Sequence, residues 1–331
     1  ARYNLLKSQG QISRVRAFYD SIMFERWLDI PLDRSCLVIG PRRAGKTTLL
    51  KKRFPTWPYV TLDDLDHLDW ATKDPKGFVS HLGGRGIIDE IQRLPILTVA
   101  VKYALDNEQA RFIMTGSSTL GLLDAAADTL AGRMEILSLP TACWGEEKGP
   151  ATHRILEDVI DLPRIKQARR LLDDAVTFGQ FPEVLGRQSG PDKHSVLANY
   201  RNTYFTRDLM QLSNIENLEG LLAVFHHLAR SIGSHLEVSN FAHESGLSHV
   251  TAKKYLNALL QAQITFKLYG YQYGPAKRYI KAAKTYFSDN GILEGLNAGI
   301  SEGQRMENFV LAELEKRRKL GFLPVEQFYY Y

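Results

Sequence analysis

One short segment restricts the possible folds of this 331-residue chain more than any other. An apolar run, Ser35–Ile39, leads into a loop bracketed by Gly40 and Gly45, and a helix-forming stretch begins at Lys46. Glycines let backbone N–H groups curl around phosphate oxygens, and the positive N-terminal end of the following helix attracts the same oxygens. The segment therefore predicts a phosphate-binding loop (P-loop) between a strand and a helix.

The spacing within the P-loop indicates which side chains meet a nucleoside triphosphate. We expect Lys46 to reach the β- and γ-phosphates of ATP, and the hydroxyl of Thr47 to ligate Mg²⁺. The residues expected to bind ATP are Gly40, Pro41, Arg42, Arg43, Ala44, Gly45, Lys46, Thr47 and Thr48. A glycine turn beside a surface lysine is the alternative, but the strand before the loop and the helix after it favour the nucleotide site.

Two acidic residues, Asp89 and Glu90, follow the apolar pair Ile87–Ile88. Alone, such a pair could mark an ordinary turn, but downstream of a P-loop it supplies what hydrolysis needs. We expect Asp89 to hold Mg²⁺ and Glu90 to orient and deprotonate the attacking water. The P-loop and the acidic pair together predict hydrolysis of ATP in addition to its binding.

Two further positions could act on the γ-phosphate. The strand Phe112–Thr115 ends just before Ser117, whose hydroxyl is our first choice for a γ-phosphate sensor, with Thr115 as the alternative. Arg133 precedes a short apolar run and could stabilise transition-state charge on the nucleotide of a neighbouring subunit. A surface ion pair with Glu135 is the alternative for Arg133. The first interpretation predicts a homo-oligomer, such as a ring.

The order of elements predicts an α/β fold with more than one domain, because a chain of this length exceeds one ordinary hydrophobic core. Short β-rich runs alternate with helical patterns up to about residue 145, which predicts a mostly parallel sheet with helices on both faces. Helical patterns dominate after Leu137. The expected domains are a P-loop domain at 1–145, a helical lid or linker at 146–215, a winged helix-turn-helix at 216–274 and a last part-domain at 275–331.

The helix-turn-helix is predicted from two short helical patterns. Phe241–Leu247 is typical of a helix that ends at a turn, and Ser248 is placed to cap a second helix. A strand pair within Ile264–Tyr273 could form a wing. The candidate DNA contacts near the start of the second helix are Ser248, His249, Thr251, Lys253, Lys254 and Asn257. A protein-binding module whose lysines face solvent is the alternative.

Composition is compatible with these interpretations. The net charge of +5 and the pI near 9.0 allow a polyanionic partner but do not predict one by themselves. The longest apolar stretches, such as Leu94–Ala100, fall well short of the ~20 residues that span a bilayer, so we expect a soluble cytoplasmic protein with no membrane partner. Cys36 and Cys143 lie far apart in the sequence, and two reduced, buried thiols are expected.

Taken in order, these motifs resemble the prokaryotic AAA ATPases in which a P-loop domain is followed by a winged helix and a C-terminal nuclease-like domain of unknown function. The resemblance covers nearly the whole chain and rests on 40–48, Leu62–Asp64, Ile88–Gln92, Thr115–Ser118, Ala131–Arg133, Gly179–Glu183, Arg207–Asp208, Ser288–Gly291 and Glu307–Val310. It implies an AAA-type parallel sheet, a winged helix after the lid and part of a nuclease-like domain at 275–331. It also implies that Arg133 is an arginine finger and Ser117 the sensor.

The chain departs from this family at two places. Gln180 stands where a second glycine is usual, which affects a turn and not the chemistry. Glu307 matches the first acidic position of the nuclease-like domain, but the other expected metal ligands do not follow before Tyr331. Two functions are therefore considered: an ATPase that couples hydrolysis to movement of a DNA- or protein-binding winged helix, and a DNA-binding regulator that is switched by nucleotide with negligible turnover.

Overall fold

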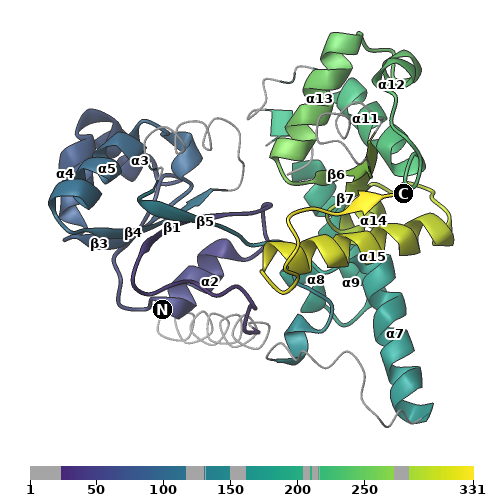
Figure 1. Cartoon of the computed structure of the whole chain (residues 1–331), viewed down its shortest axis with the longest axis horizontal. Coiled ribbons are helices and arrows are strands. Elements are labelled where there is room, and N and C mark those ends of the chain that lie inside the picture. Colours follow the sequence, from purple (N-terminus) through teal and green to yellow (C-terminus); the bar gives the residue numbers. More distant parts are fainter. Residues whose placement is uncertain are drawn as a thin grey trace, which may run out of the picture.

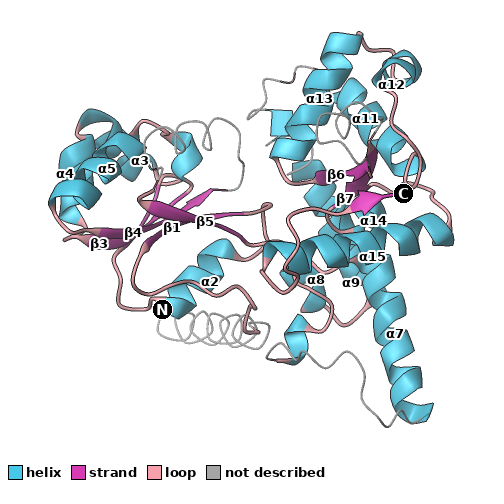
Figure 2. Cartoon of the chain, viewed as in Figure 1, coloured by secondary structure: helices cyan, strands magenta, loops and turns pink. Residues whose placement is uncertain are grey.

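The computed structural model describes residues 24–116, 130, 132–149, 162–203, 209–210, 215, 217–271 and 283–331. This part of the chain forms a parallel sheet with flanking helices and a mainly helical half with a second, smaller sheet (Figure 1, Figure 2). Helix α15 (Glu302–Lys319) runs from the helical half toward the larger sheet (Figure 1). No helix in these ranges is both long and apolar enough to cross a bilayer.

The larger sheet has five parallel strands in the order β2-β3-β4-β1-β5. The strands are β1 (Ser35–Ile39), β2 (Tyr59–Thr61), β3 (Arg85–Asp89), β4 (Arg111–Gly116) and β5 (Met134–Ser138). The expected parallel α/β sheet is therefore confirmed. Because β4 lies between β1 and β3, its end is placed between the P-loop that follows β1 and the acidic pair at the end of β3.

Helices cover both faces of this sheet. Alternate residues of a strand point to opposite faces. Cys36 and Val38 pack with Leu50 of α2 (Lys46–Arg53), whereas Leu37 and Ile39 belong to the cluster on the other face. The helices over that second face are α3 (Leu65–Lys73), α4 (Pro75–His81) and α5 (Leu97–Asn107). A strand buried on both faces is apolar throughout, which is why β1 is a continuous apolar run.

The helical half is built around one large hydrophobic cluster. Besides α15, its helices are α7 (Leu162–Phe178), α8 (Pro182–Leu185), α9 (Gly190–Tyr200), α11 (Leu218–Arg230), α12 (Val238–Glu244), α13 (His249–Gln261) and α14 (Asn290–Gly295). α12 and α13 form the expected pair of helices joined by a turn. At the start of α13 the Ser248 hydroxyl accepts a hydrogen bond from the Thr251 N–H at 3.1 Å, as its capping role predicted.

The second sheet has the strand order β7-β6-β8. Strand β6 (Thr265–Gly270) pairs antiparallel with β7 (Lys284–Phe287) and parallel with β8 (Tyr329–Tyr330). A strand pair within Ile264–Tyr273 was therefore the wrong expectation, because β6 takes its antiparallel partner from further along the chain. The pairing joins segments on either side of the division expected after residue 274 into one sheet.

Candidate functional site

The P-loop joins β1 to α2 at the carboxyl edge of the larger sheet. Geometry favours glycine at both ends of the loop. A Cβ atom on Gly40 would lie 2.0 Å from the Leu139 carbonyl oxygen, and Gly45 has a φ of +90°, which residues with a Cβ atom rarely adopt. The Ala44 N–H closes the turn with a hydrogen bond to the Pro41 carbonyl at 3.2 Å. The two glycines thus occupy the two positions of the loop where a side chain would clash or strain the main chain.

Lys46, the first residue of α2, is only 5% exposed. Its Nζ donates hydrogen bonds to the carbonyl oxygens of Gly40 at 2.8 Å and Pro41 at 3.1 Å. Burial lowers the pKa of Lys46 to about 8, although the charges of Glu90 and Asp89 act in the opposite direction. The ammonium group therefore lies near the acidic pair, in a setting where a bound anion would favour its charged form.

Asp89, the last residue of β3, receives hydrogen bonds from three hydroxyl groups. Thr47 donates to its Oδ2 at 2.7 Å, Tyr59 donates to the same oxygen at 2.6 Å, and Thr115 donates to Oδ1. Burial and the bond to Asp89 raise the pKa of the Tyr59 hydroxyl. The two expected Mg²⁺ ligands, Thr47 and Asp89, are therefore in direct contact although 42 positions separate them in the sequence.

Glu90 follows Asp89 in a left-handed backbone conformation, with φ 59° and ψ 42°. Its N–H donates to the Thr115 hydroxyl at 3.4 Å, and its carboxylate accepts a hydrogen bond from the Gln92 side chain just within the short helix Ile91–Arg93. A positive φ is uncommon for a residue with a side chain and is concentrated at functional sites. The chain thus turns sharply between the two carboxylates, so that they leave the strand in different directions.

The structure describes one of the two candidates for the γ-phosphate sensor. Ser117 lies outside the described residues. Thr115 is fully buried on β4, opposite Val38 of β1, and its hydroxyl is bonded to Asp89. Thr115 therefore helps to orient the Asp89 carboxylate.

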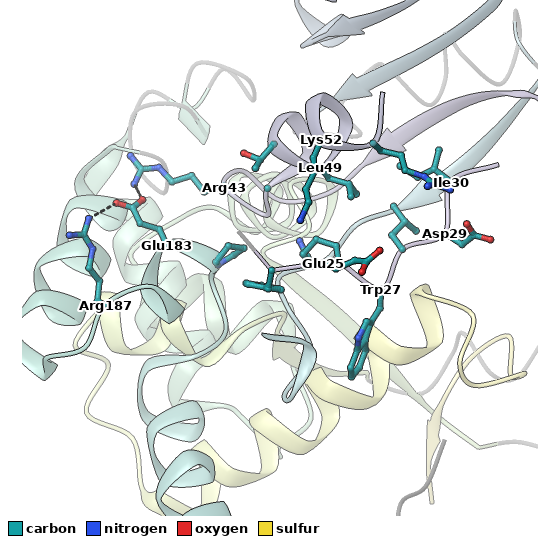
Figure 3. A pocket seen from close by; sticks show the side chains of 16 residues that line it. Glu25, Trp27, Asp29, Ile30, Arg43, Leu49, Lys52, Glu183 and Arg187 are labelled. Atoms are coloured by element: carbon teal, nitrogen blue, oxygen red, sulfur yellow. Dashed lines mark hydrogen bonds and ion pairs between the residues drawn. The ribbon is translucent and has the colours of Figure 1, made fainter. Parts of the chain in front are cut away.

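A cavity of about 760 Å³ opens beside the P-loop (Figure 3). Three parts of the chain line it: the segment 24–30, the P-loop with one side of α2, and α8 with the residues after it. Thr48, one of the expected ATP-binding residues, is in its wall together with Gly45 and Trp27. The volume lies within the range of small-molecule pockets, and the wall at Gly45 continues into the P-loop. The cavity is therefore placed to take the base and ribose of a nucleotide whose phosphates lie in the loop.

Sequence reasoning missed the residues of the helical half that contact the P-loop. Glu183 of α8 forms an ion pair with Arg43 at 2.8 Å and also points toward Arg187 (Figure 3). Tyr200 of α9 donates a hydrogen bond to the Arg42 carbonyl at 2.8 Å. Glu183 belongs to one of the motifs that carried the family resemblance, so a signal for it was present. Its role depends on how the helical half packs against the loop, which the motif does not reveal.

Arg133 lies at the opposite edge of the sheet from the P-loop. It directly precedes β5, whereas the P-loop follows β1, and these two strands are parallel. Its Nε is 2.6 Å from Asp106 at the end of α5, and its side chain is 37% exposed. A surface ion pair was expected as the alternative role, with Glu135 as the partner. The pair is present with Asp106, while Glu135 lies 3.5 Å from Arg34.

The candidate DNA contacts lie along α13. His249, Lys253, Lys254 and Asn257 are exposed. Ser248 and Thr251 are held in the helix cap, where their hydroxyl oxygens are 2.8 Å apart. Burial and the nearby charge of Lys253 lower the pKa of Lys267 on β6, so the two lysines are close enough to repel each other. These residues thus lie together at the start and along the exposed face of α13.

Three smaller expectations concern Glu307 and the two cysteines. Glu307 accepts a hydrogen bond from the Tyr286 hydroxyl at 2.8 Å. Within the described part of the chain, no group of three His, Cys, Asp or Glu side chains could hold a metal ion. Cys36 and Cys143 are both buried and unbridged, as expected, and burial raises the pKa of Cys36 to about 11.

Comparison with known protein families agrees with the geometry of the P-loop sheet. Residues 33–147, which include all five strands of that sheet, match the family described as AAA domain. This part of the chain is therefore similar to AAA domains. Residues 169–303 match a second family, described as a domain of unknown function. The first match thus contains the P-loop, the acidic pair and Arg133, and the second match covers most of the helical half.

Related proteins carry no assigned function. Uncharacterised proteins of Mycobacterium tuberculosis and Mycobacterium bovis are each 28% identical to the chain over 292 residues, which is 84% of this chain and 61% of theirs. An uncharacterised protein of Methanocaldococcus jannaschii is 24% identical over 315 residues, covering 89% of this chain and 68% of that protein. The chain therefore spans less than two thirds of the length of its mycobacterial relatives.

Among solved structures, one similar chain is a signal transduction ATPase with numerous domains and a tetratricopeptide repeat sensor, from Pyrococcus horikoshii. It is 13% identical, and the match has a TM-score of 0.30 and covers 92% of this chain and 47% of that one.

Proposed function

We propose that this chain is a Mg²⁺-dependent ATPase whose hydrolysis cycle moves a DNA-binding winged helix. The observation that carries the proposal is the 2.7 Å hydrogen bond between Thr47 of the P-loop and Asp89 at the end of β3, with Glu90 in the next position. It brings the phosphate loop, two oxygen ligands and a candidate base to one edge of the sheet. Binding of ATP requires only the first of these, whereas hydrolysis requires all three.

The side chains at this edge fit Mg²⁺. The ion prefers oxygen ligands, keeps several waters and usually takes one or two protein oxygens besides those of the phosphates. Oγ1 of Thr47 and Oδ2 of Asp89 supply two such oxygens side by side. When bound, Mg²⁺ would neutralise charge on the phosphate oxygens and so favour displacement at the γ-phosphorus.

The other residues of the edge supply binding and proton transfer. Lys46 would exchange its bonds to the Gly40 and Pro41 carbonyls for bonds to the β- and γ-phosphates. Glu90 would hold the attacking water and accept its proton as the bond from the γ-phosphorus to the bridging oxygen breaks, leaving that electron pair on ADP. The cavity beside Thr48 would take the base and ribose.

The position of Arg133 supports an oligomer. Arg133 lies at the edge of the sheet away from the P-loop of its own chain, so it could reach a nucleotide only on another subunit. It is partly exposed, and its ion pair with Asp106 is at the surface, where such pairs contribute little to stability and exchange readily. A homo-oligomer, with a ring as one arrangement, would therefore complete each site with an arginine finger from a neighbour.

The exposed face of α13 supports DNA as the partner. Lys253 and Lys254 project from the half of the helix that usually enters the major groove, and positive charge there would attract phosphates. The helical half also contacts the P-loop through Glu183 and Tyr200. A change at the loop on hydrolysis could therefore move the helical half and the face of α13 with it.

The ATPase rate per subunit, measured against protein concentration, tests this proposal in the parent, Glu90→Gln and Arg133→Ala proteins. The parent rate should rise with concentration as subunits assemble. Glu90→Gln should bind ATP with the parent affinity but hydrolyse it at least about a hundredfold more slowly, because the proton acceptor is lost. Arg133→Ala should remain at the slow rate of a separate subunit. Arg34→Ala removes another exposed arginine at the same edge and should behave like the parent.

Each other outcome would change a defined part of the proposal. A flat, near-zero parent rate at every concentration would contradict hydrolysis and favour a DNA-binding regulator switched by nucleotide. A parent that turns over while Arg133→Ala equals it at every concentration would remove the arginine finger and leave the ATPase assignment in place. Equal losses in Arg133→Ala and Arg34→Ala would indicate an assembly surface and not a catalytic arginine.

A further inference from the structure

A buried arginine outside the sequence motifs contacts the P-loop. The side chain of Arg26 is 6% exposed and comes from the segment that precedes β1. One terminal nitrogen, Nη1, donates a hydrogen bond to the main-chain carbonyl of Ala44, and the other, Nη2, donates to the Pro140 carbonyl at 2.9 Å. Its Nε is bonded to the Glu146 carboxylate at 2.8 Å. The planar guanidinium thus serves three acceptors at once through the fixed directions of its N–H groups.

The contact with Ala44 bears on the side of the loop that meets phosphate. In a trans peptide the C=O of one residue and the N–H of the next point in opposite directions. The structure has no cis peptide bond among its described residues. Holding the Ala44 carbonyl against Arg26 therefore directs the Gly45 N–H away from Arg26, to the other side of the chain. That N–H belongs to the group of backbone donors with which a P-loop holds phosphate oxygens.

Glu146 holds Arg26 in this position. Its side chain is completely buried, and besides Arg26 it accepts a hydrogen bond from the Cys143 N–H at 2.7 Å and another from the Trp27 N–H. A buried carboxylate with a cation and two N–H donors is fully compensated, whereas either member of the pair alone would be costly. The Arg26 side chain is therefore fixed by its partners before any ligand arrives.

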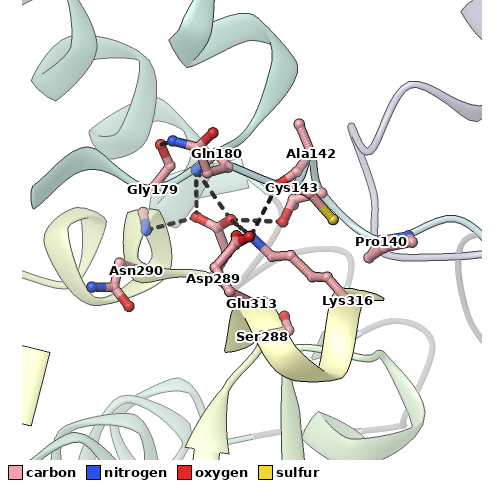
Figure 4. Close-up of polar contacts among 12 residues, drawn as sticks. Pro140, Ala142, Cys143, Gly179, Gln180, Ser288, Asp289, Asn290, Glu313 and Lys316 are labelled. Atoms are coloured by element: carbon pink, nitrogen blue, oxygen red, sulfur yellow. Dashed lines mark hydrogen bonds and ion pairs between the residues drawn. The ribbon is translucent and has the colours of Figure 1, made fainter. Parts of the chain in front are cut away.

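The segment that carries Pro140 and Glu146 is anchored on its other side by the helical half. Asp289 accepts hydrogen bonds from the Thr141 hydroxyl at 2.6 Å and from Lys316 at 3.0 Å, and Lys316 also donates to the Ala142 carbonyl at 3.1 Å (Figure 4). Burial alone would lower the pKa of Lys316, but the charges of Asp289 and Glu313 outweigh it and raise the pKa. Arg26 therefore links the P-loop to a segment that buried ionic contacts hold in place.

We propose that Arg26, held by Glu146, is a positioning residue for the P-loop: it fixes the Ala44–Gly45 peptide with its N–H toward the bound phosphates. The inference rests on the proposed nucleotide site and adds a residue that lies outside the P-loop motif. Arg26 acts on the phosphates through the main chain of the loop and does not contact the reacting atoms.

Binding of inorganic tripolyphosphate, ATP and adenosine, each measured by calorimetry, tests the proposal with Arg26→Gln and the double variant Arg26→Gln/Glu146→Gln. The double variant leaves no unpaired buried charge, and thermal unfolding followed by circular dichroism establishes that it is folded. Both variants should bind tripolyphosphate and ATP about tenfold more weakly than the parent. Arg26→Lys, which can still donate to the Ala44 carbonyl, should recover part of the loss.

Arg305→Gln is the matched control. The Arg305 Nη1 also donates to a main-chain carbonyl, that of Thr177 at 3.0 Å, and to a carboxylate, that of Glu294 at 2.7 Å, but it lies away from the P-loop. This variant loses the same kinds of contact and should keep the parent affinity for tripolyphosphate.

The readouts separate the alternatives. Unchanged tripolyphosphate affinity in a folded double variant would overturn the positioning role. So would a loss of affinity for adenosine and ATP with tripolyphosphate unaffected, because Arg26, which also lines the base cavity, would then act on the base and not on the loop. A parent chain that binds neither ATP nor tripolyphosphate would overturn the proposed function itself, and this inference with it.

Discussion

The carboxyl edge of the five-stranded sheet and the exposed face of α13 both gather candidate site residues, but they hold them differently. At the sheet edge, Lys46 and Asp89 are 5% and 3% exposed, and both are hydrogen-bonded. On α13, Lys253 and Asn257 extend into solvent. Groups that are positioned in advance lose little freedom when a ligand binds, whereas exposed lysines act mainly as mobile positive charges. Substitutions at the two regions should therefore differ in size, and the ligands affected should differ as well.

The largest effect is expected for Lys46→Ala, which should weaken ATP binding by about a hundredfold or more. The substitution removes hydrogen bonds from a charged donor to the phosphates, each contributing roughly 1.5–3 kcal/mol. Calorimetric titration with ATP measures the loss. DNA affinity of the same variant in the absence of nucleotide should equal that of the parent, because α13 is untouched. An equal loss of DNA and ATP binding would erase the distinction between the two regions.

A rise in pH is expected to have an intermediate effect on ATP affinity. In the free protein, burial lowers the pKa of Lys46 to about 8, so the group is mostly neutral at pH 9 and mostly charged at pH 7. Bound phosphates favour the charged form, so binding at pH 9 should take up close to one proton, and ATP affinity should fall about tenfold between pH 7 and pH 9. Calorimetry in buffers of different ionisation enthalpy counts the protons. Binding at pH 9 without proton uptake would show that Lys46 stays charged in the free protein.

The smallest effect is expected for Lys253→Ala/Lys254→Ala. DNA binding should weaken by less than about tenfold, and the slope of log affinity against log salt should decrease by about two, because two phosphate contacts are lost. Fluorescence anisotropy over a salt series measures both quantities. The ATPase rate in the absence of DNA and the melting temperature should not change. Lys73→Ala, at an exposed lysine at the end of α3, is the control and should leave DNA binding unaltered.

Absence of DNA binding by the parent at low salt would assign the α13 face to a protein partner. The nucleotide predictions would be unaffected, because they depend on a separate set of residues.

The parts of the nucleotide site that depend on local sequence could be predicted. The P-loop needs a strand, two glycines and a helix in succession, and all of these are encoded between Ser35 and Arg53. The acidic pair could be assigned because Asp89 ends an apolar strand, and parallel strands bring their carboxyl ends to one edge. In the helical half, Ser248 could also be assigned as a helix cap, because the cap joins residues only three positions apart.

The parts that depend on tertiary packing could not be predicted. Arg26 and Glu146 are 120 positions apart, and neither lies in a motif. The ion pair of Arg133 is made with Asp106 because the end of α5 packs beside the start of β5, and charge spacing along the chain favoured a nearer residue. The strand pair expected for the wing was wrong for a similar reason, because alternation of side chains identifies a strand but does not identify its partner.

The strand order of the smaller sheet bears on how the molecule is made. At the ribosome, chains emerge at roughly 5–20 residues per second and N-terminal units fold first. The five-stranded sheet has all its strands once Ser138 has emerged, whereas β6 must wait for β7 and then for β8, which includes Tyr330. Unpaired strand edges promote association with other chains. The nascent helical half therefore passes through a stage in which both edges of β6 are open to pairing with other chains.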